Sequence, residues 1–442
     1  MGQQETIGIA LVGCGTVGSA VIRLLVRDNE LLTRRAGVRP VLRHVVDVDF
    51  ARARQAGADP SLFRKNLDEV LKDPDTSVVV ELVGGTKIAR KFVEQALRAG
   101  KHVVTANKAL LAHHGNELWA LARANKVCIA FEGSCVGGVP VIGVLLNGLL
   151  ANDIEAMYGI VNGTCNYILS NMTAHGARYA DVLLQAQQAG LAEADPSLDV
   201  CGTDSAHKIA ILGALAFGQR VEFDKIHVEG IDTLDVADIR FGKELGYTVK
   251  LLAIAERLPE GVSLRVHPSF IPAGHPLAPV SGAFNALSIF AHATGHTLYY
   301  GRGAGGMPTA SAVVSDILSI ALDIAPRQFS QLGIWPDRAK PARMLPIEQI
   351  RSRYYLRITG EDRPGVLGSI ADVLGRHEIS IASVLQHESA LPAAEGVPII
   401  ITTYEAVEGN IAEARAEIDA MECVGAPTVV IRIVMEHEEP VV

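Results

Sequence analysis

The chain has 442 residues, 49% of them hydrophobic and 20% charged, which is the composition of a globular protein long enough for two or three domains. Its formal net charge of −9 and the lack of a block of lysines and arginines argue against nucleic acid as a partner. The longest apolar runs fall well short of the ~20 residues of a membrane-spanning helix, so we expect no membrane association.

The cysteines indicate the redox environment. Six are scattered along the chain, without the short paired spacings of a zinc site or the density of a disulfide-rich scaffold. We therefore expect reduced thiols and a cytoplasmic location.

Short β-branched runs alternate with helical segments over residues 7–132. This alternation predicts a doubly wound parallel sheet with helices on both faces, as in Rossmann-type nucleotide-binding domains. We expect this domain to span residues 1–136 and to be completed by a helix at 308–330. The predicted strands are IGIALV (7–12), VLRHVVDV (41–48), SVVVELVG (77–84), HVVTA (102–106) and VCIAFE (127–132).

Three glycines, Gly13, Gly15 and Gly18, follow the first predicted strand and open the next helix. Their spacing supplies a tight turn, close approach of the backbone to a pyrophosphate, and free N–H groups at the positive end of a helix. Because strand, turn and helix all agree, we expect a dinucleotide site here, with Thr16 and Val17 at the helix start.

The residues that read the adenosine ribose of the cofactor should follow the second strand. Asp47 or Asp49 accepting from a 2′-hydroxyl favours NAD, whereas Arg52 and Arg54 holding a 2′-phosphate favour NADP. Solvated surface charge is the third interpretation. The pattern leaves the cofactor as NAD(P).

Ligands of doubly wound sheets bind beyond the carboxyl ends of the strands. This rule places ELVGGT (81–86), TANKAL (105–110) and FEGSCVGGVP (131–140) on the cofactor side. Lys108 stands at a helix start, where the helix dipole disfavours a cation, so we expect an anionic substrate or cofactor group beside it. A solvent-exposed lysine is the alternative. Glu132 and the main-chain carbonyls after it have the ligand chemistry of a hard monovalent cation; a plain loop between domains is the alternative.

The pattern changes from residue 137, where longer connections and many glycines separate strands and helices. We expect an α+β domain for substrate binding and dimerisation at 137–307. A proline-rich linker should follow at 331–350. The order of predicted elements over 351–436 is βαββαβ, a known arrangement for a small domain.

A predicted helix near residue 203 carries charges on an apolar background. Asp204 and Lys208 lie one turn apart on one face, with Thr203 as the expected N-cap. A small zwitterionic substrate needs carboxylates for its ammonium group and a proton donor at its carbonyl oxygen. The alternative is a lysine that snorkels from an apolar face beside a helix-stabilising aspartate. The loop before the helix adds three carboxylates: Glu193, Asp195 and Asp199.

Several blocks of the chain share their spacing with one family. The longest run comprises Ala186, Gly190, Leu191, Ala192, Asp195, Pro196, Asp199, Val200, Gly202, Asp204 and Lys208. The others are VNGTCNYIL (161–169), TANKALLA (105–112), GGVPVI (137–142), RVHPSFIP (265–272) and GRGAGGMPTA (301–310). Together they resemble the homoserine dehydrogenase family over roughly residues 5–345.

The resemblance implies an oxidoreductase that reversibly reduces L-aspartate 4-semialdehyde to L-homoserine with NAD(P), in threonine and methionine biosynthesis. It implies Lys208 as proton donor or acceptor and Lys108 near the nicotinamide and the substrate. The implied substrate-binding residues are Glu193, Asp199, Asp204 and Thr164. The implied cofactor-binding residues beyond the glycine turn are Thr105, Lys108, Gly190 and Gly303. A homodimer or homotetramer is also implied.

Two positions depart from the family pattern, one at the expected cation site and one at the expected cofactor site. The family holds a sodium-type ion with a glutamate side chain and three carbonyls, which implies Glu132, Cys135, Gly137 and Val139 here; Cys135 replaces the commoner valine, and backbone ligation tolerates the change. Val48 stands where many relatives have an arginine before the aspartate, which weakens the expectation of strict NADP preference.

The region 353–435 is similar to the ACT family of amino-acid-sensing modules, through the loop Asp362, Arg363, Pro364 and Gly365 between its first strand and first helix. This resemblance implies an effector, L-threonine as a feedback inhibitor before any other, at an interface between modules. A domain that only assists oligomerisation is the alternative. For the whole chain, the alternative to an enzyme is a non-catalytic sensor of a dinucleotide and an amino acid.

Overall fold

The computed structural model describes residues 4–387, 396–435 and 437. Contacts group the chain into two compact units, which we describe separately. Unit 1 comprises residues 1–163, 204–224 and 283–342, and unit 2 comprises 164–203, 225–282 and 343–442. Residues of the expected second domain, 137–307, fall in both units. Residues 1–3 and 436, at ends of expected domains, lie outside the described residues.

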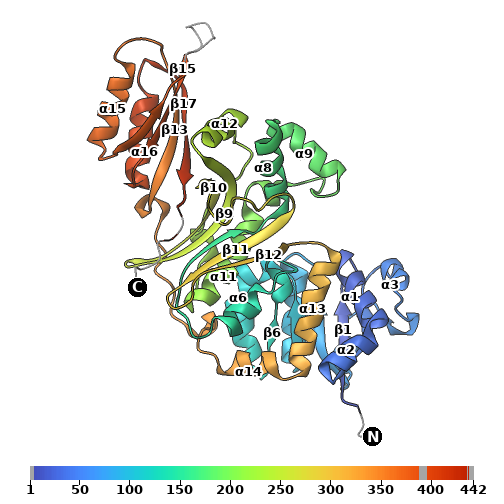
Figure 1. Ribbon diagram of the computed structural model, residues 1–442. Coiled ribbons are helices and arrows are strands. Elements are labelled where there is room, and N and C mark those ends of the chain that lie inside the picture. Colours follow the sequence, from blue (N-terminus) through green and yellow to red (C-terminus); the bar gives the residue numbers. More distant parts are fainter. Residues whose placement is uncertain (1–3, 388–395, 436, 438–442) are drawn as a thin grey trace. The chain divides into compact units, whose positions relative to one another are not determined.

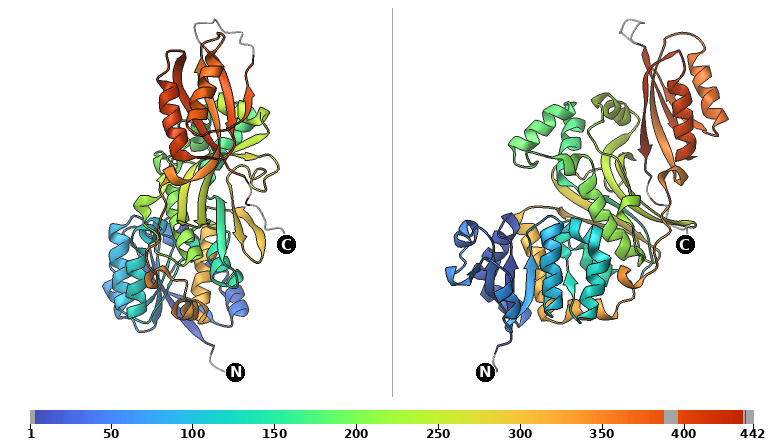
Figure 2. Two further views of the ribbon diagram at one scale, coloured as in Figure 1. Left: turned by 90° about the vertical axis from the view of Figure 1, so that its left-hand side faces the viewer. Right: turned by 180° about the vertical axis from the view of Figure 1, so that it is seen from behind.

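Unit 1 contains a six-stranded parallel sheet in the order β3-β2-β1-β4-β5-β6. Helices lie on both of its faces (Figures 1 and 2), which confirms the predicted doubly wound, Rossmann-type layout. Its strands are β1 (Thr6–Val12), β2 (Arg39–Val46), β3 (Phe63–Arg64), β4 (Thr76–Glu81), β5 (His102–Thr105) and β6 (Ile129–Ala130). The β-branched residues that predicted these strands are almost all buried, as expected for a sheet covered on both faces.

The helices of this sheet follow the predicted pattern with small shifts at their ends. They are α1 (Thr16–Arg27), α2 (Asn29–Ala36), α3 (Ala51–Gln55), α4 (Asp68–Lys72), α5 (Lys87–Arg98) and α6 (Lys108–Ala124), with a short 3₁₀ helix, η1 (Pro60–Leu62). The side chain of Asn107 caps α6 by accepting from the backbone N–H of Leu110 at 3.1 Å. This cap fixes where Lys108 enters the helix.

The single helix expected at 308–330 is two helices, α13 (Gly306–Ala321) and α14 (Ile324–Gln331). The break lies at Asp323, whose φ of +58° is a left-handed conformation that aspartate tolerates better than most residues. α13 packs against α1. Among the described residues no single helix is long and apolar enough to span a membrane; the pair Gly306–Ala321 and Ile324–Arg338 passes that test only when taken together, and it is bent by 77°.

Part of the expected linker is packed instead of solvated. Trp335 is 2% exposed and lies edge-on against Trp119, Phe131 and Phe329. Arg123 of α6 pairs with Asp337 of η5 (Pro336–Arg338) at 2.9 Å. The proline content of this stretch gave no signal for the buried tryptophan.

Unit 1 is completed by a second group of strands and by one buried helix. β7 (Ile154–Ile160), β11 (Phe284–Ala291) and β12 (Gly295–Arg302) pair antiparallel, with β11 in the middle. The helix α11 (Thr203–Phe217) is buried along almost its whole length. Three short helices follow β6: η2 (Glu132–Ser134), α7 (Val141–Gly143) and the π-helical η3 (Val144–Gly148); η4 (Phe223–Lys225) comes after α11.

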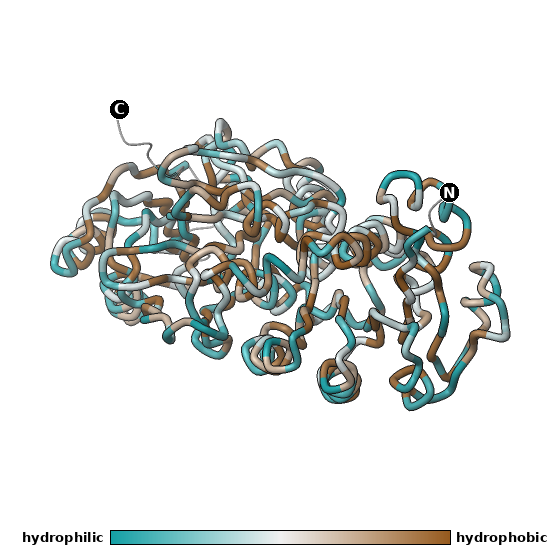
Figure 3. The backbone as a smooth tube through the Cα atoms, turned by 90° about the horizontal axis from the view of Figure 1, so that it is seen from below, coloured by the Kyte–Doolittle hydropathy of each residue, from teal (hydrophilic) through white to brown (hydrophobic). Residues whose placement is uncertain are grey.

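Unit 2 has a mixed sheet in the order β9-β10-β17-β13-β15-β14. β9 (Tyr247–Leu258) and β10 (Gly261–Pro272) form a long antiparallel hairpin, and β8 (His227–Val228) pairs with β10. Its helices before residue 347 are α8 (Gly163–His175), α9 (Tyr179–Gln188), α10 (Ser197–Val200) and α12 (Val236–Glu244). In the hydropathy-coloured backbone the outer turns are mainly hydrophilic (Figure 3).

The C-terminal part of unit 2 confirms the predicted βαββαβ order. Its elements are η6 (Ile347–Gln349), β13 (Arg351–Gly360), α15 (Val366–Arg376), β14 (Ile381–Leu385), β15 (Val397–Thr403), β16 (Ala406–Val407), α16 (Glu408–Asp419) and β17 (Val424–Ile433). Apolar residues of both helices and of β13 and β15 form one buried cluster. β17 also pairs with β10 at Ser269 and Phe270, so the module shares a sheet with the hairpin.

Candidate active site

In the glycine turn after β1, the space around the second glycine, Gly15, is free of other atoms of the described chain. Gly13 has φ +98°, and a Cβ on Gly18 would lie 2.0 Å from the carbonyl oxygen of Gly13, so these two positions require glycine for the turn and for close packing. A Cβ on Gly15, by contrast, would meet nothing within 4 Å. The helix α1 starts at Thr16 immediately beside this open position, which fits a pyrophosphate at the helix N-terminus.

Charges of both signs stand beside this turn. The carboxylate of Asp47 accepts from the backbone N–H of Cys14 at 2.5 Å and from that of Val48 at 2.6 Å. Arg52 donates to the hydroxyl of Thr16 at 3.4 Å. Burial, with Asp47 next, raises the pKa of the Cys14 thiol to about 12, so this cysteine is an inert thiol at neutral pH. The two groups that predicted NAD and NADP therefore lie at the same turn.

Thr105, at the end of β5, is held by Glu81, the last residue of β4. Its hydroxyl donates to the buried carboxylate of Glu81 at 2.7 Å and accepts from the backbone N–H of Asn107 at 3.0 Å. Glu81 also accepts from the N–H of Val83 at 2.8 Å. Glu81 thus forms hydrogen bonds at the ends of both β4 and β5, where the cofactor side of a doubly wound sheet is expected.

Three charged residues of α6 and α11 meet in unit 1. The ammonium group of Lys208 donates to one carboxylate oxygen of Asp204 at 2.7 Å, and Lys108 pairs with the other at 2.6 Å. The side chains of Lys208 and Asp204 are 8% and 5% exposed, whereas that of Lys108 is 40% exposed. We call these three residues the lysine–aspartate cluster; it holds two cations for one carboxylate.

Two groups that sequence reasoning missed complete this cluster. The carbonyl oxygen of Val161 accepts from Lys208 at 2.5 Å, and the side-chain amide of Asn162 donates to Asp204 at 2.8 Å. Burial by itself would raise the pKa of Asp204, but Lys208 and Lys108 hold it well below its usual value, so the carboxylate stays ionised. The Val161 carbonyl could not be predicted, because a main-chain carbonyl gives no side-chain signal in a sequence. Asn162 could have been found, because it lies in the VNGTCN block.

The start of α11 differs by one residue from the expectation. Thr203 is the first residue of the helix and not its N-cap, and Gly202 before it has φ +86°. The hydroxyl of Thr203 contacts the thiol of Cys201 at 3.0 Å. A displacement of one residue leaves the spacing of Asp204 and Lys208 unchanged, because both lie inside the helix.

The remaining predicted substrate residues lie in unit 2. Thr164, in the first turn of α8, donates to the carboxylate of Asp199 at 3.1 Å and to the carbonyl of Leu191 at 3.0 Å. Glu193 is exposed in the loop after α9, and Gly190 in the same loop has φ +69°. The structure therefore brings Thr164 and Asp199 together, with Gly190 and Glu193 on the adjoining loop.

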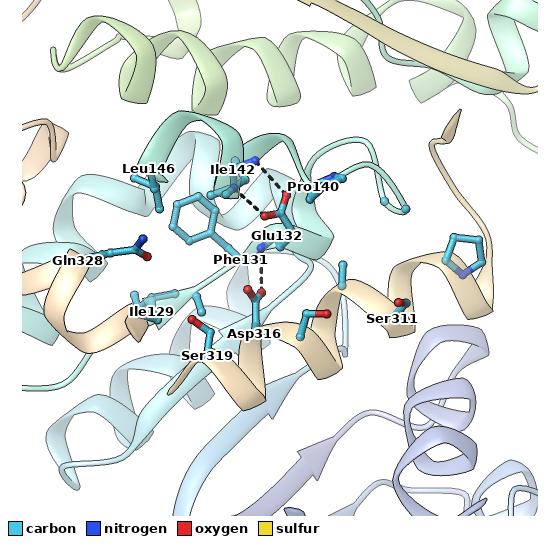
Figure 4. A pocket seen from close by; sticks show the side chains of 18 of the residues that line it. Ile129, Phe131, Glu132, Pro140, Ile142, Leu146, Ser311, Asp316, Ser319 and Gln328 are labelled. Atoms are coloured by element: carbon cyan, nitrogen blue, oxygen red, sulfur yellow. Dashed lines mark hydrogen bonds between the residues drawn. The ribbon is translucent and has the colours of Figure 1, made fainter. Parts of the chain in front are cut away.

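The loop after β6 carries a buried carboxylate. The oxygens of Glu132 accept from the backbone N–H groups of Ile142 at 2.9 Å and Gly143 at 2.7 Å, and its own N–H donates to Asp316 at 2.8 Å (Figure 4). Burial raises the pKa of Glu132 to about 7 and that of Asp316 well above its usual value. Both carboxyl groups line a cavity of about 590 Å³.

The backbone between Glu132 and Val139 is strained. Val136 is fully buried and has φ +52°, a conformation that a β-branched residue rarely adopts, and Gly137 follows with φ +41°. A Cβ on Gly137 would lie 2.5 Å from the carbonyl oxygen of Gly303, so two residues implied for different ligands are neighbours. Within the described residues no group of three or more histidine, cysteine or acidic side chains is arranged to hold a metal ion.

Comparison with known families agrees with these features. The family described as homoserine dehydrogenase, NAD binding domain, matches residues 13–132, that of homoserine dehydrogenase matches 140–318, and the ACT domain matches 354–422. The first of these matches confirms the expected nicotinamide dinucleotide cofactor at this level of detail.

Individual relatives extend the likeness to the whole chain. A homoserine dehydrogenase of Neisseria gonorrhoeae is 43% identical over 98% of this chain and 100% of its own length, and one of Corynebacterium glutamicum is 40% identical over 98% and 96%. The crystal structure of a homoserine dehydrogenase from Thiobacillus denitrificans superposes with a TM-score of 0.92 at 42% identity, covering 98% of this chain and 100% of that one. The chain therefore belongs to the homoserine dehydrogenase family of oxidoreductases.

Proposed function

We propose that the protein catalyses the reversible NAD(P)-dependent reduction of L-aspartate 4-semialdehyde to L-homoserine, a step of threonine and methionine biosynthesis in the cytoplasm. The observation that carries the proposal is the lysine–aspartate cluster, Lys108, Asp204 and Lys208, in which two cations share one buried carboxylate. A site with one positive charge in excess stabilises the negative charge that develops on an aldehyde oxygen as it is reduced.

The nicotinamide dinucleotide, when bound, supplies or accepts the hydride. Lys208 donates a proton to the aldehyde oxygen in the reduction and takes it from the hydroxyl in the reverse direction. Asp204 holds the ammonium group of Lys208 in place and neutralises part of its charge, because both are buried within 2.7 Å of each other. Lys108, which is more exposed, adds the second positive charge beside substrate and nicotinamide.

We assign the substrate's ammonium group to carboxylates of unit 2. Glu193 and Asp199 supply the negative charge, and Thr164 orients Asp199 through its 3.1 Å hydrogen bond. Asp204 of unit 1 is a substrate-binding residue of the proposal through the two lysines that its carboxylate holds. The cofactor-binding residues of the proposal are Gly13, Gly15, Thr16, Val17, Gly18, Thr105, Lys108, Gly190 and Gly303. The solved structure of a hyperthermophilic archaeal homoserine dehydrogenase in complex with NADPH supports this class of cofactor.

Measuring the absorbance of reduced nicotinamide with aspartate semialdehyde tests the activity. We expect oxidation with NADH or NADPH, and the ratio of kcat/KM values for the two gives the preference that Asp47 and Arg52 leave open. No oxidation with either cofactor would contradict the enzyme and favour the non-catalytic sensor. A panel of other small aldehydes separates this substrate from those of other amino-acid dehydrogenases.

A monovalent cation is part of the proposal, held by the side chain of Glu132 and the carbonyls of Cys135, Gly137 and Val139. The buried carboxylate and the strained backbone at Val136 support it, since oxygen ligands suit a hard cation. Activity should rise with sodium chloride relative to choline chloride at equal ionic strength, and this difference should disappear in Glu132→Gln. Equal activity in both salts would rule the cation out.

We further propose that the C-terminal module, residues 351–436, binds L-threonine and mediates feedback inhibition, and that the protein forms a homodimer or homotetramer. The loop Asp362–Gly365 precedes α15, and Gly365 has φ +95° at the helix start. Deleting the module would expose the edge of β10, because β17 pairs with it. Asp362→Ala is therefore the cleaner test: we expect a higher threonine concentration for half-inhibition at unchanged activity, whereas unchanged inhibition would place the effector elsewhere.

Light scattering of the purified protein tests the proposed homodimer or homotetramer.

The domain boundaries remain part of the proposal. They comprise an NAD(P)-binding domain at 1–136 completed by residues 308–330, a substrate and dimerisation domain at 137–307, and a connecting segment at 331–350. Limited proteolysis at 343–350 tests the last boundary, since this stretch joins unit 1 to the C-terminal module.

A further inference from the structure

A pair of histidines joins the two helices that carry the lysine–aspartate cluster. The Nε2 atoms of His113 on α6 and His207 on α11 lie 3.3 Å apart, within hydrogen-bond distance. His207 is 7% exposed and directly precedes Lys208 in the chain, whereas His113 is exposed and follows Lys108 by five residues. The contact therefore links α6 and α11 close to the Lys108–Asp204 ion pair.

An aromatic ring packs against both histidines. Phe223 of η4 stacks on His207 with ring centroids 4.8 Å apart and an interplanar angle of 17°, and it meets His113 edge-on at 4.4 Å. The two imidazoles themselves meet at 5.3 Å and 71°. Such offset and edge-on contacts hold rings in fixed orientations beyond the area they bury. The three rings form one packed group, which we call the histidine clamp.

The histidine clamp can keep α6 and α11 at a fixed separation, which the Lys108–Asp204 ion pair requires. Lys108 occupies the first turn of α6, where the helix dipole disfavours a cation, and its ion pair with Asp204 offsets that cost only if the two helices keep their separation. Ion pairs of partly exposed lysines are weak and tolerate several side-chain geometries. The hydrogen bond between His113 and His207 adds a second directional link between the two helices beside this ion pair.

We propose that His113 and His207 are positioning residues, which hold α6 against α11 so that Lys108 and Lys208 stay on the two oxygens of Asp204. The proposal rests on the proposed reductase function. One imidazole donates and the other accepts, so the contact needs at least one neutral ring. Neither histidine touches substrate or cofactor in this scheme.

The test compares two replacements of His207 and one of His113. His207→Phe keeps an aromatic ring for Phe223 and removes the hydrogen bond, whereas His207→Gln keeps a polar group that can bond to His113. We expect His207→Phe and His113→Phe to lower kcat about 3- to 10-fold, the effect of losing one neutral hydrogen bond, with the Kd for reduced cofactor unchanged within about twofold. His207→Gln should recover most of kcat.

A double-mutant comparison separates positioning from general destabilisation. In a Lys108→Met background, His113→Phe should cause little further loss of kcat, because its effect acts through Lys108. Equal loss of kcat in His207→Phe and His207→Gln, unchanged kcat in both phenylalanine variants, or a full additive loss in the Lys108→Met background would overturn the inference. Wild-type turnover is recorded in the same assay, so a failure of the reductase proposal itself would be seen separately.

Discussion

Lys208 in unit 1 and Lys250 in unit 2 are two buried lysines in different surroundings. Each donates to a main-chain carbonyl at 2.5 Å, that of Val161 for Lys208 and that of Val280 for Lys250. Lys208 also has the carboxylate of Asp204 at 2.7 Å. Burial lowers the pKa of Lys250 to about 8.

The comparison indicates what a buried proton donor needs. A carbonyl oxygen satisfies one N–H but carries too little charge to offset the loss of water around an ammonium group. A carboxylate beside the ammonium group, as Asp204 is beside Lys208, provides the missing charge and leaves the lysine able to donate to a third group. Arginine would not serve, because its guanidinium does not release a proton under ordinary conditions. Arg357 of unit 2 instead holds a bidentate structural pair with Asp238.

The largest expected effect is on turnover. Lys208→Ala should lower kcat by about 10²- to 10⁴-fold, the usual contribution of a general acid, while the affinity for reduced cofactor changes little. Lys250→Ala is the matched control, since it removes an equally buried lysine and should leave kcat near the wild-type value. Steady-state kinetics and fluorescence titration of the cofactor measure both. Equal losses of turnover and cofactor affinity in Lys208→Ala would give that lysine a positioning role.

Removing the carboxylate should have a smaller effect. In Asp204→Asn both lysines lose their charged partner, but Lys208 keeps its bond to Val161, so we expect kcat to fall by about 10- to 100-fold. The measurement is again steady-state kinetics. An undiminished kcat would show that Asp204 is dispensable for the proton donor.

The variant Asp204→Asn also allows a prediction about stability at low pH. Because the folded-state pKa of Asp204 lies below its unfolded value of about 3.9, its contribution to stability is complete above pH 3.9 and is lost as the pH falls toward the folded value. Urea denaturation between pH 5 and pH 3 should therefore show a steeper loss for the wild type than for Asp204→Asn. Parallel curves would contradict the electrostatic account of the cluster.

The last prediction concerns Lys250 and affects stability alone. Its folded-state pKa of about 8 lies below the unfolded value of about 10.4, so burial of the charge costs stability below pH 8, and this cost disappears as the pH rises toward 10.4. The difference in unfolding free energy between wild type and Lys250→Met should change by up to about 3 kcal/mol in favour of the wild type over this range. A constant difference would show that this lysine keeps its charge when buried.

Much of the fold was predictable because its signals are local. The alternation of strands and helices, the glycine turn at Gly13 to Gly18 and the βαββαβ order at the C-terminus all follow from patterns within a few residues of each other. Helical spacing by itself places Asp204 and Lys208 on one face. The burial of Trp335 escaped prediction because it depends on Trp119 and Phe131, which lie far away in the chain.

Residue identity and short-range spacing by themselves determined that this chain has a dinucleotide turn, a C-terminal βαββαβ module and a helix with an acid and a base one turn apart. Only the tertiary structure decided that Lys108 reaches the same carboxylate, that the Val161 carbonyl and Asn162 complete the cluster, and that two histidines join the helices beside it. The physical reason is that a hydrogen bond or ion pair forms by distance in space, and main-chain carbonyls have the same chemistry at nearly every position.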